Sequence, residues 1–411
     1  MPQPQGTAVM KRRKEFYFEV LKEDKKSRAR LGVIQTRRGP IDTPYLIPVA
    51  TLASVRALGS DDLAVLGAQC VLANAYHLHL KPGDEVIKKL GGLHRFMAFD
   101  RPIFSDSAGF QAFSLGFGRE HNISKIGSIF PEGRETEDKR ENLTRITDEG
   151  IYFKSAQDGT WNFMDAQTSM KIQSNLGADI IMAFDECTSP LSDYDYTKKA
   201  MKRTHEWATL SLKYHNKKQA IYGIIQGGWF KDLRQESTEF ITSLPFDGIA
   251  IGGSLGNCKS DMHQVLEWVI PNLDERPRHL LGIGEIDDIF ECVARGVDTF
   301  DCVSPTRLAR RGNVFISPES GGEPENKFRI TIRAPQYKDD KKPIDSRCTC
   351  STCQRYSRAY VRHLYTANEL SYFRLASMHN LHFMLRLMEQ IRASIHNRTF
   401  TRLKQKWLKT S

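Results

Sequence analysis

The 411-residue sequence predicts an α/β protein: a closed (β/α)8 barrel followed by a smaller helical subdomain that carries a cysteine cluster. Eight short apolar segments alternate with amphipathic stretches, which indicates parallel strands joined by helices. Polar and glycine residues recur at the ends of these segments. Beyond about residue 312 the alternation stops, and three cysteines lie close together in the sequence.

The predicted strands are short apolar runs bounded by turn residues, as expected for strands that are buried on both faces. They cover residues 45–50, 70–76, 102–105, 178–184, 220–225, 247–252, 278–283 and 297–301. Amphipathic stretches between them predict helices over residues 54–67, 170–176, 195–214, 233–243, 262–270 and 287–295.

Six of the predicted strands end in polar or glycine residues. A single residue of this kind is most simply a helix cap or a turn. Six together favour one shared site, because (β/α)8 barrels have their active sites at the carboxyl ends of the strands. From the third strand to the eighth, these ends are residues 105–111, 184–187, 226–228, 252–253, 282–285 and 300–302.

The predicted barrel covers residues 15–312, with a charged, glycine-containing surface insertion at about 118–145. A second unit over residues 313–398 is expected to close the barrel. Basic tails, at 1–14 and 399–411, flank these units, and such tails are usually solvated and loosely ordered.

The net charge of +10 and the isoelectric point near 9.1 are compatible with a polyanionic partner or with a merely basic protein. The longest apolar run, residues 178–184, is far too short to span a membrane. The basic N-terminus is not followed by an apolar stretch, so it does not resemble a secretory signal. We therefore expect a cytoplasmic protein without a membrane partner.

The clustered cysteines predict a metal site. Cys348, Cys350 and Cys353 lie within six residues of each other, which makes three unrelated surface thiols an improbable alternative. Three thiolates and one imidazole form a tetrahedral structural zinc site. Spacing alone leaves His363, His379 and His382 open as the fourth ligand. One Zn²⁺ per subunit would join the cysteine loop to the C-terminal helices.

Two aspartates at strand ends indicate chemistry at a sugar. Asp106 and Asp301 would face each other across the barrel mouth, where one carboxylate can attack an anomeric carbon while the other moves a proton. Asp185 could accept hydrogen bonds from the N–H edge of a purine. The basic segment 306–311 follows Asp301 and could hold phosphates. These residues predict an enzyme that acts on a nucleoside within a nucleic acid.

The motifs then point to a family. In order they read Ser-Asp-Ser-Ala-Gly-Phe-Gln, Phe-Asp-Glu-Cys, Gly-Ile-Ile-Gln-Gly, Ala-Ile-Gly-Gly, Phe-Asp-Cys-Val-x-Pro-Thr-Arg and Cys-x-Cys-x2-Cys with Met-His-Asn. Over roughly residues 15–395 the chain closely resembles the bacterial-type tRNA-guanine transglycosylases, also called queuine tRNA-ribosyltransferases.

The resemblance implies a reaction and an assembly. Members exchange the guanine at the wobble position of tRNA for a 7-deazaguanine, in queuosine modification, through a covalent aspartyl-ribosyl intermediate. The implied base is 7-aminomethyl-7-deazaguanine. The usual assembly is a homodimer in which one subunit catalyses while the other helps to hold the tRNA.

The resemblance also implies a role for each site residue. Asp301 is the expected nucleophile and Asp106 the expected proton acceptor, while Phe110 would stack on the base and His379 would be the fourth zinc ligand. The implied base-binding residues are Asp106, Ser107, Ala108, Gly109, Phe110, Asp185, Gln226, Gly253 and Leu281. The implied tRNA-contacting residues are Gly282, Ile283, Gly284, Glu285, Ile286, Asp287, Asp288, Thr306, Arg307, Leu308, Ala309 and Arg310.

Two departures from the family pattern bear on function. Ala108 replaces the first glycine of the usual Asp-Ser-Gly-Gly turn, which requires a negative φ or some strain. Residues 254–257, Ser-Leu-Gly-Asn, replace the usual Leu-Ala-Val-Gly-Glu; they are one residue shorter and lack the acid. The identity of the incoming base is therefore open between the aminomethyl precursor and queuine itself.

Two other readings of the family resemblance remain. A non-catalytic tRNA-binding partner subunit would not need a nucleophile, and this chain has both Asp106 and Asp301. Archaeal relatives that modify the tRNA D-arm normally carry a further RNA-binding module, which we do not expect after the zinc-site helix.

Overall fold

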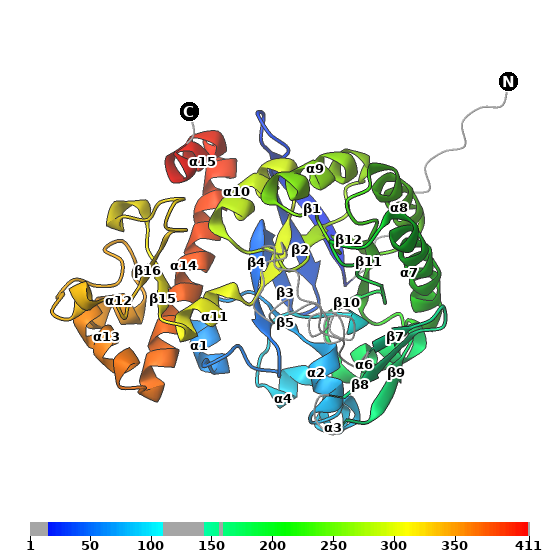
Figure 1. The fold of residues 1–411 in the computed structure, drawn as a ribbon, viewed down its shortest axis with the longest axis horizontal. Helices are drawn as coiled ribbons and strands as arrows, with labels where there is room; N and C mark the ends of the chain where they lie inside the picture. The colour runs from blue at the N-terminus through cyan, green and yellow to red at the C-terminus, as the bar shows by residue number, and fades with distance from the viewer. Residues whose placement is uncertain (1–14, 110–143, 156–158, 410–411) are drawn as a thin grey trace.

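The computed structural model describes residues 15–109, 144–155 and 159–409. The eight predicted strands form a closed parallel barrel in the order β10-β11-β12-β13-β14-β4-β5-β6, which confirms the predicted fold class (Figure 1). Their bounds are β4 Tyr45–Ala50, β5 Val71–Ala73, β6 Ile103–Ser105, β10 Ile180–Met182, β11 Ala220–Ile225, β12 Gly248–Ile251, β13 Arg278–Leu280 and β14 Thr299–Cys302.

Helices surround the barrel (Figure 1). They are α1 Ser60–Val65, α2 Ala75–Leu80, α3 Asp84–Lys89, α4 Leu93–Phe96, α6 Ala166–Leu176, α7 Tyr194–Tyr214, α8 Lys231–Ser243, α9 Lys259–Val269, α10 Ile286–Arg295 and α11 Ser304–Arg310, with a 3-10 turn η1 at Ile270–Asn272. At the amino-terminal ends of several helices, a side chain caps the first turn. The Asp165 side chain accepts the Thr168 N–H at the start of α6, and Asp193 accepts the Tyr196 N–H at the start of α7.

Three of the predicted strands extended too far at their carboxyl ends. The second strand ends at Ala73, not at residue 76, because Asn74 caps helix α2 by accepting the His77 N–H. The fourth ends at Met182 and the seventh at Leu280, where the chain turns toward the barrel mouth. An apolar run can continue into a buried turn, so apolar sequence alone does not locate the end of a strand.

Two antiparallel sheets lie outside the predicted alternation. The first contains β1 Tyr17–Glu23, β2 Arg30–Thr36 and β3 Gly39–Thr43. The second contains β7 Thr144–Ile146, β8 Ile151–Lys154 and β9 Trp161–Met164. The predicted insertion at 118–145 lies outside the described residues except for its last two positions, which begin β7.

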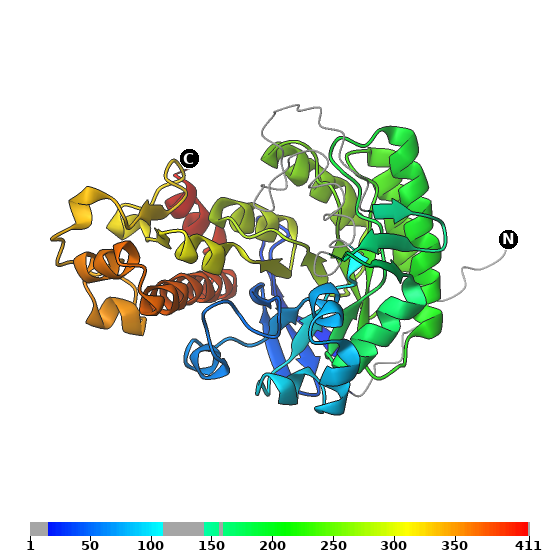
Figure 2. The same cartoon turned by 60° about the horizontal axis from the view of Figure 1, so that its bottom comes forward.

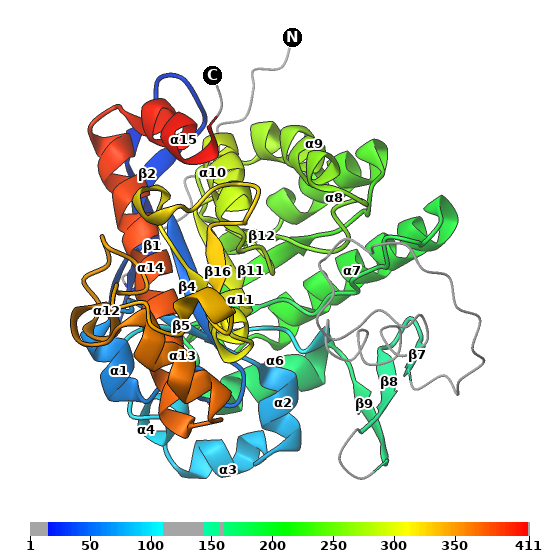
Figure 3. The ribbon, with the colours of Figure 1, turned by 60° about the vertical axis from the view of Figure 1, so that its left-hand side comes forward.

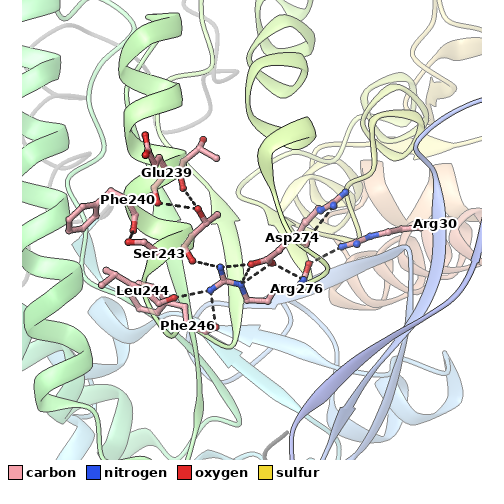
Figure 4. Close-up of polar contacts among 11 residues, drawn as sticks. Arg30, Glu239, Phe240, Ser243, Leu244, Phe246, Asp274 and Arg276 are labelled. Carbon is pink, nitrogen blue, oxygen red and sulfur yellow. Dashed lines mark hydrogen bonds and ion pairs between the residues drawn. The ribbon is translucent and has the colours of Figure 1, made fainter. Parts of the chain in front are cut away.

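The first sheet lies against the amino-terminal ends of the barrel strands. Arg30 of β2 donates from Nε and Nη2 to both carboxylate oxygens of Asp298, at 2.8 and 2.6 Å, and Asp298 directly precedes β14. Nearby, Arg276 donates to the carbonyls of Thr242, Leu244 and Phe246 at the end of α8 (Figure 4). These contacts close the end of the barrel that is remote from the predicted site.

Beyond the barrel, the chain forms a lobe with its own small apolar core (Figure 2). The lobe contains β15 Asn313–Phe315, β16 Arg329–Thr331, α12 Ser351–Arg355 and α13 Arg358–Thr366, with 3-10 turns η2 Pro318–Ser320 and η3 Pro335–Tyr337. The long helix α14, Leu370–His396, runs between this lobe and the barrel, where it packs on α11 and β4 (Figure 3).

The expectation of a loosely ordered C-terminal tail is wrong for residues 400–408. They form helix α15, Phe400–Leu408, which buries Phe400 and Trp407 in the main core. Two lysines of this helix and the lysine that follows it form ion pairs: Lys404 with Glu291, Lys406 with Glu319 and Lys409 with Glu323. This basic segment therefore docks on the protein itself.

Within the described ranges, the helices are all too short or too polar to cross a membrane.

Candidate active site and metal centre

Asp106 lies directly after β6 at the carboxyl end of the barrel. The Asn74 side chain donates to Asp106 Oδ2 at 2.5 Å, and the backbone N–H groups of Ala75 and Ala108 donate to Oδ1 at 2.8 and 3.3 Å. Burial raises the pKa of Asp106 to about 7 despite these bonds, and the negative charges of Asp301 and Asp185 add to the rise. Asp106 can therefore gain or lose a proton near neutral pH.

Ala108 adopts a φ of +69°, so the turn after Asp106 is strained, as one of the two sequence-based alternatives expected. Its side chain is buried. The Ala108 N–H, which belongs to the peptide before this residue, donates to Asp106 Oδ1. The strain is thus located directly after a carboxylate with a raised pKa.

Asp185 follows β10 and is fully enclosed. Ser107 Oγ donates to its Oδ1 at 2.9 Å, and Gln226 Nε2 donates to its Oδ2 at 2.7 Å. Burial raises the pKa of Asp185 to about 6, and the nearby Glu186 carboxylate adds to the rise while the two hydrogen bonds oppose it. The pair Asp185–Gln226 presents a carboxylate and an amide side by side, as recognition of a purine edge requires.

Asp301 lies on β14, and its side chain is 16% exposed. The Gly282 N–H donates to Asp301 Oδ1 at 2.8 Å. Nε2 of the buried His279 lies 3.3 Å from the same oxygen, and its Nδ1 lies 3.0 Å from Thr299 Oγ1. The loop after β13 therefore holds one carboxylate oxygen, and His279 of β13 lies beside it.

Gln226 and Gly253 meet at the carboxyl ends of β11 and β12. Gly253 has a φ of +79°, and a methyl group at this position would lie 2.0 Å from Gln226 Oε1. Only glycine allows this approach. Among the described residues, the buried Gln226 Oε1 and Ser254 Oγ have no hydrogen-bond partner. Unpaired buried polar atoms are costly, so these two atoms are available to a ligand.

The remaining predicted base-binding residues surround this point. The Gly109 N–H donates to Ser107 Oγ at 3.2 Å, and the Leu281 N–H donates to the Ile251 carbonyl at 3.2 Å. Phe110, which we expect to stack on the base, lies outside the described residues.

The two predicted tRNA-contacting segments follow the neighbouring strands β13 and β14. In the first, Gly282 is exposed, whereas Ile283, Gly284, Ile286 and Asp288 are buried. In the second, helix α11 buries Thr306 and Ala309 but leaves Arg307, Leu308 and Arg310 partly exposed. Among these residues, it is therefore mainly the arginines of α11 whose side chains can contact a polyanion.

Sequence reasoning missed three residues of the site. Asn74 lay inside a predicted strand, although its position at a strand end resembles those that were singled out. His279 lay within an apolar run. Arg234 of α8 is fully buried and bonds only to backbone carbonyls, which leave no pattern in a sequence.

The three cysteines meet one histidine in the C-terminal lobe. The sulfur atoms of Cys348, Cys350 and Cys353 and one ring nitrogen of His379 all lie within 4.8 Å of one another. His379 Nε2 lies 2.7 Å from the Phe315 carbonyl, so Nε2 carries the hydrogen and Nδ1 is free to bind a metal ion. Two buried thiols, the partly buried thiol of Cys348 and an oriented imidazole match the donor set of structural zinc.

The other two candidate histidines are placed differently. His363 is exposed on α13. His382 Nδ1 lies 3.4 Å from Cys348 Sγ, but the side chain is partly exposed and its Nε2 lies near Thr349 Oγ1. The geometry therefore brings His379, not His363 or His382, into the four-residue cluster.

Helix α14 connects this cluster to the active site. Asn380, next to His379, donates to the carbonyls of Pro305 and Asn313 and accepts the Phe315 N–H. Tyr372 Oη donates to the Ala309 carbonyl at 2.8 Å. Both contacts hold α11, the helix that directly follows the Asp301 strand.

Fold and site together define a (β/α)8-barrel enzyme with a cluster of carboxylates at its mouth and a Cys3His metal-binding cluster beside it. The chain belongs to the queuine tRNA-ribosyltransferase family, whose model matches residues 24–411, and the family expected from the motifs is confirmed.

Similar proteins carry the same family name. A relative from Archaeoglobus fulgidus is 54% identical over 389 residues, which is 93% of this chain and 96% of the relative. A queuine tRNA-ribosyltransferase from Roseiflexus sp. is 43% identical over 405 residues, 95% of this chain and 98% of the relative. Another, from Caldanaerobacter subterraneus, is 42% identical over 396 residues, 95% of this chain and 96% of the relative.

Proposed function

We propose that this protein exchanges the guanine at the wobble position of tRNA for a 7-deazaguanine base. The main observation in support is that Asp106, Asp185 and Asp301 lie together at one end of the barrel. Among the described residues, no lysine or arginine forms an ion pair with any of the three. Two carboxylates with different tasks are suited to displacement at a sugar C1′. Membership of the queuine tRNA-ribosyltransferase family supports tRNA as the nucleic acid.

The first half of the reaction removes guanine. The Asp301 carboxylate attacks C1′ of the target ribose through the oxygen that Gly282 does not hold, and an ester bond forms. The C1′–N9 bond breaks, and its electron pair goes to guanine N9. Asp106 in its protonated form supplies the proton that N9 takes up, which its pKa of about 7 allows.

The second half inserts the new base. Asp106, now a carboxylate, takes the N9 proton of the incoming 7-deazaguanine. N9 attacks C1′, the ester bond breaks, and Asp301 leaves as a carboxylate. Asp185, Gln226 and the Gly253 backbone would hold both bases by the same edge, because the two bases share that edge.

For the incoming base we propose 7-aminomethyl-7-deazaguanine, with queuine also accepted. The loop at 254–257 is short and uncharged, so it lacks the acid that helps to form the pocket for a small ammonium group and leaves room for a larger substituent. Exchange kinetics with both bases test this. Efficiencies within about tenfold, or ~1.4 kcal/mol, support dual use, and rejection of queuine by several orders of magnitude contradicts it.

For the metal cluster we propose one structural Zn²⁺ per subunit. When bound, the ion would join the 348–353 loop to α14 and thereby stabilise the contacts that Asn380 makes with α11. Metal analysis should find one zinc, Cys350→Ser should lose it, and His382→Ala should retain it as a matched control. Loss of zinc in His382→Ala would move the fourth ligand from His379 to His382.

We also propose that the chain acts in the cytoplasm, and that it forms a homodimer, as the family resemblance implies for the assembly. Sedimentation equilibrium should give twice the chain mass. A monomer that exchanges guanine at full rate would contradict this part of the proposal.

Incorporation of labelled guanine into tRNA tests the function directly. The wild-type protein should incorporate the label and form a covalent RNA adduct that survives denaturation. Asp301→Ala should do neither, yet should bind tRNA with unchanged affinity. A wild-type protein that binds tRNA without exchange would instead be a non-catalytic partner subunit.

A further inference from the structure

Arg234 is a buried cation that has no carboxylate partner in the part of the chain that the structure describes. It lies in the first turn of α8 and is 0% exposed. Burial lowers the pKa of its guanidinium to about 10, which still leaves it charged at neutral pH. Within the described ranges, no aspartate or glutamate forms an ion pair with it. A charge in this position normally requires a compensating partner.

Its partners are four backbone carbonyls. Nε donates to the Gly228 carbonyl at 2.8 Å, and Nη1 donates to those of Ile225 and Gly252 at 3.0 and 2.9 Å. Nη2 donates to the Ser254 carbonyl at 2.8 Å. The planar fork of the guanidinium is suited to such a set, because it presents five donors in a fixed geometry.

These carbonyls bracket two base-binding residues. Ile225 and Gly228 lie on either side of Gln226, and Gly252 and Ser254 lie on either side of Gly253. Arg234 thus joins the loop after β11 to the loop after β12. It also explains how two glycine-rich loops keep one conformation, because it holds backbone carbonyls of both.

The bond to Gly252 sets the direction of a donor. The Gly252 carbonyl and the Gly253 N–H belong to one planar trans peptide, so they point in opposite directions. Because the carbonyl points to Arg234 on the outer helix, the Gly253 N–H points away from α8. By contrast, the Gln226 N–H is already used, since it donates to Ser237 Oγ at 3.1 Å.

We propose that Arg234 is a positioning residue for base recognition: it aims the Gly253 N–H and fixes Gln226 beside Asp185. This inference rests on the proposed base exchange. We expect Arg234 to affect binding of the free base more than binding of the tRNA, because the tRNA is also held by contacts outside the base pocket.

The chain offers a matched control. Arg276 also donates to three carbonyls, those of Thr242, Leu244 and Phe246, but it does so at the opposite end of the barrel (Figure 4). Arg234→Lys and Arg276→Lys both keep the charge and lose the fork. Both should lower the melting temperature, so only a difference in kinetics separates a positioning role from a structural one.

Guanine exchange kinetics test the proposal. Arg234→Lys should raise the KM for guanine by about 10²-fold, as a displaced binding group does, and leave the KM for tRNA nearly unchanged. Arg276→Lys should leave both constants at their wild-type values. The proposal is overturned if the two variants behave alike, or if Arg234→Lys changes both KM values equally.

A second measurement uses the wild-type protein and does not depend on how a variant folds. With tRNA present, saturating guanine should protect the Gly253 amide from hydrogen exchange and leave the Gln226 amide unchanged. An unprotected Gly253 amide would overturn the proposal. Failure of the wild-type protein to incorporate guanine would instead contradict the proposed function itself.

Discussion

Strand β14 has an aspartate at each end, and the two lie in opposite surroundings. Asp298, just before the strand, is fully buried; Arg30 holds both its oxygens, and the Arg278 N–H donates to Oδ2 at 2.7 Å. Asp301, three positions later, is held through one oxygen by the Gly282 N–H and faces His279. Only Thr299 and Phe300 thus separate a carboxylate that is neutralised by an arginine from the carboxylate that we propose as the nucleophile.

Strand β10 repeats the contrast. Burial would raise the pKa of Asp179 before the strand, but His94, the Ile103 N–H and Arg37 together bring it below its usual value. After the strand, burial raises the pKa of Asp185 to about 6. At the amino-terminal end, Asp298 and Asp179 are therefore paired with basic side chains, whereas at the carboxyl-terminal end Asp106, Asp185 and Asp301 have no lysine or arginine partner among the described residues. The first arrangement serves stability, and the second keeps carboxylates available for chemistry.

The largest expected effect lies at the amino-terminal end. Arg30→Met leaves Asp298 buried without its cation, which should cost about 3–5 kcal/mol of unfolding free energy. Urea denaturation measures this loss. Guanine exchange, assayed under conditions in which the variant is folded, should stay at the wild-type rate. A stability loss much smaller than this would mean that Asp298 finds another partner.

A smaller effect of opposite sign is expected at the carboxyl-terminal end. The pKa of Asp106 is raised to about 7 from 3.8, so the wild-type protein should lose stability as the pH rises through this window. Asp106→Asn removes this loss and should be more stable than the wild type by about 2–4 kcal/mol at pH 8, where the upper figure is the full free-energy equivalent of a rise in pKa from 3.8 to about 7.

The pH series is the check on this prediction. The unfolding temperatures of the two proteins should converge as the pH falls from about 7 toward 3.8, because over this range Asp106 is protonated in the folded state but ionised in the unfolded state, so each fall in pH favours folding of the wild type. A constant difference between the two proteins at all pH values would show that the carboxylate charge is not the cause.

The smallest effect concerns the strained turn. Ala108→Gly should relieve the positive φ and stabilise the protein by about 1 kcal/mol. Ala98, with a φ of +50° away from the site, provides the control: Ala98→Gly should give a similar gain and leave exchange unchanged. A loss of stability in Ala108→Gly would mean that the buried methyl group contributes more than the strain costs.

The barrel could be predicted from sequence because its strands are buried on both faces and therefore have continuous apolar sequences. The β1 strand, by contrast, has partly exposed and exposed residues in alternation, and it resembles a polar connection more than a core strand. The small sheets at both ends of the barrel were therefore missed, although the Asp298 contact depends on one of them.

The site was predictable where a polar residue follows an apolar run, as for Asp106, Asp185 and Asp301. Asn74 and His279 could not be singled out, because each lies inside an apolar run that begins as a strand and continues into a buried turn. Arg234 could not be found at all, since backbone carbonyls of any sequence can accept its hydrogen bonds. What sequence reasoning identified are the groups that we propose to react, and what it missed are groups that contact and position them.

The most direct test of the contrast compares Asp298→Asn with Asp301→Asn by two measurements on the same preparations: unfolding free energy and guanine exchange. Asp298→Asn should lose about 3–5 kcal/mol of stability and keep exchange within about threefold. Asp301→Asn should stay within about 1 kcal/mol of wild-type stability and lose exchange by at least about 10⁴-fold, or ~5.5 kcal/mol of transition-state stabilisation. An Asp301→Asn protein that exchanges guanine at a rate near that of the wild type would contradict the account.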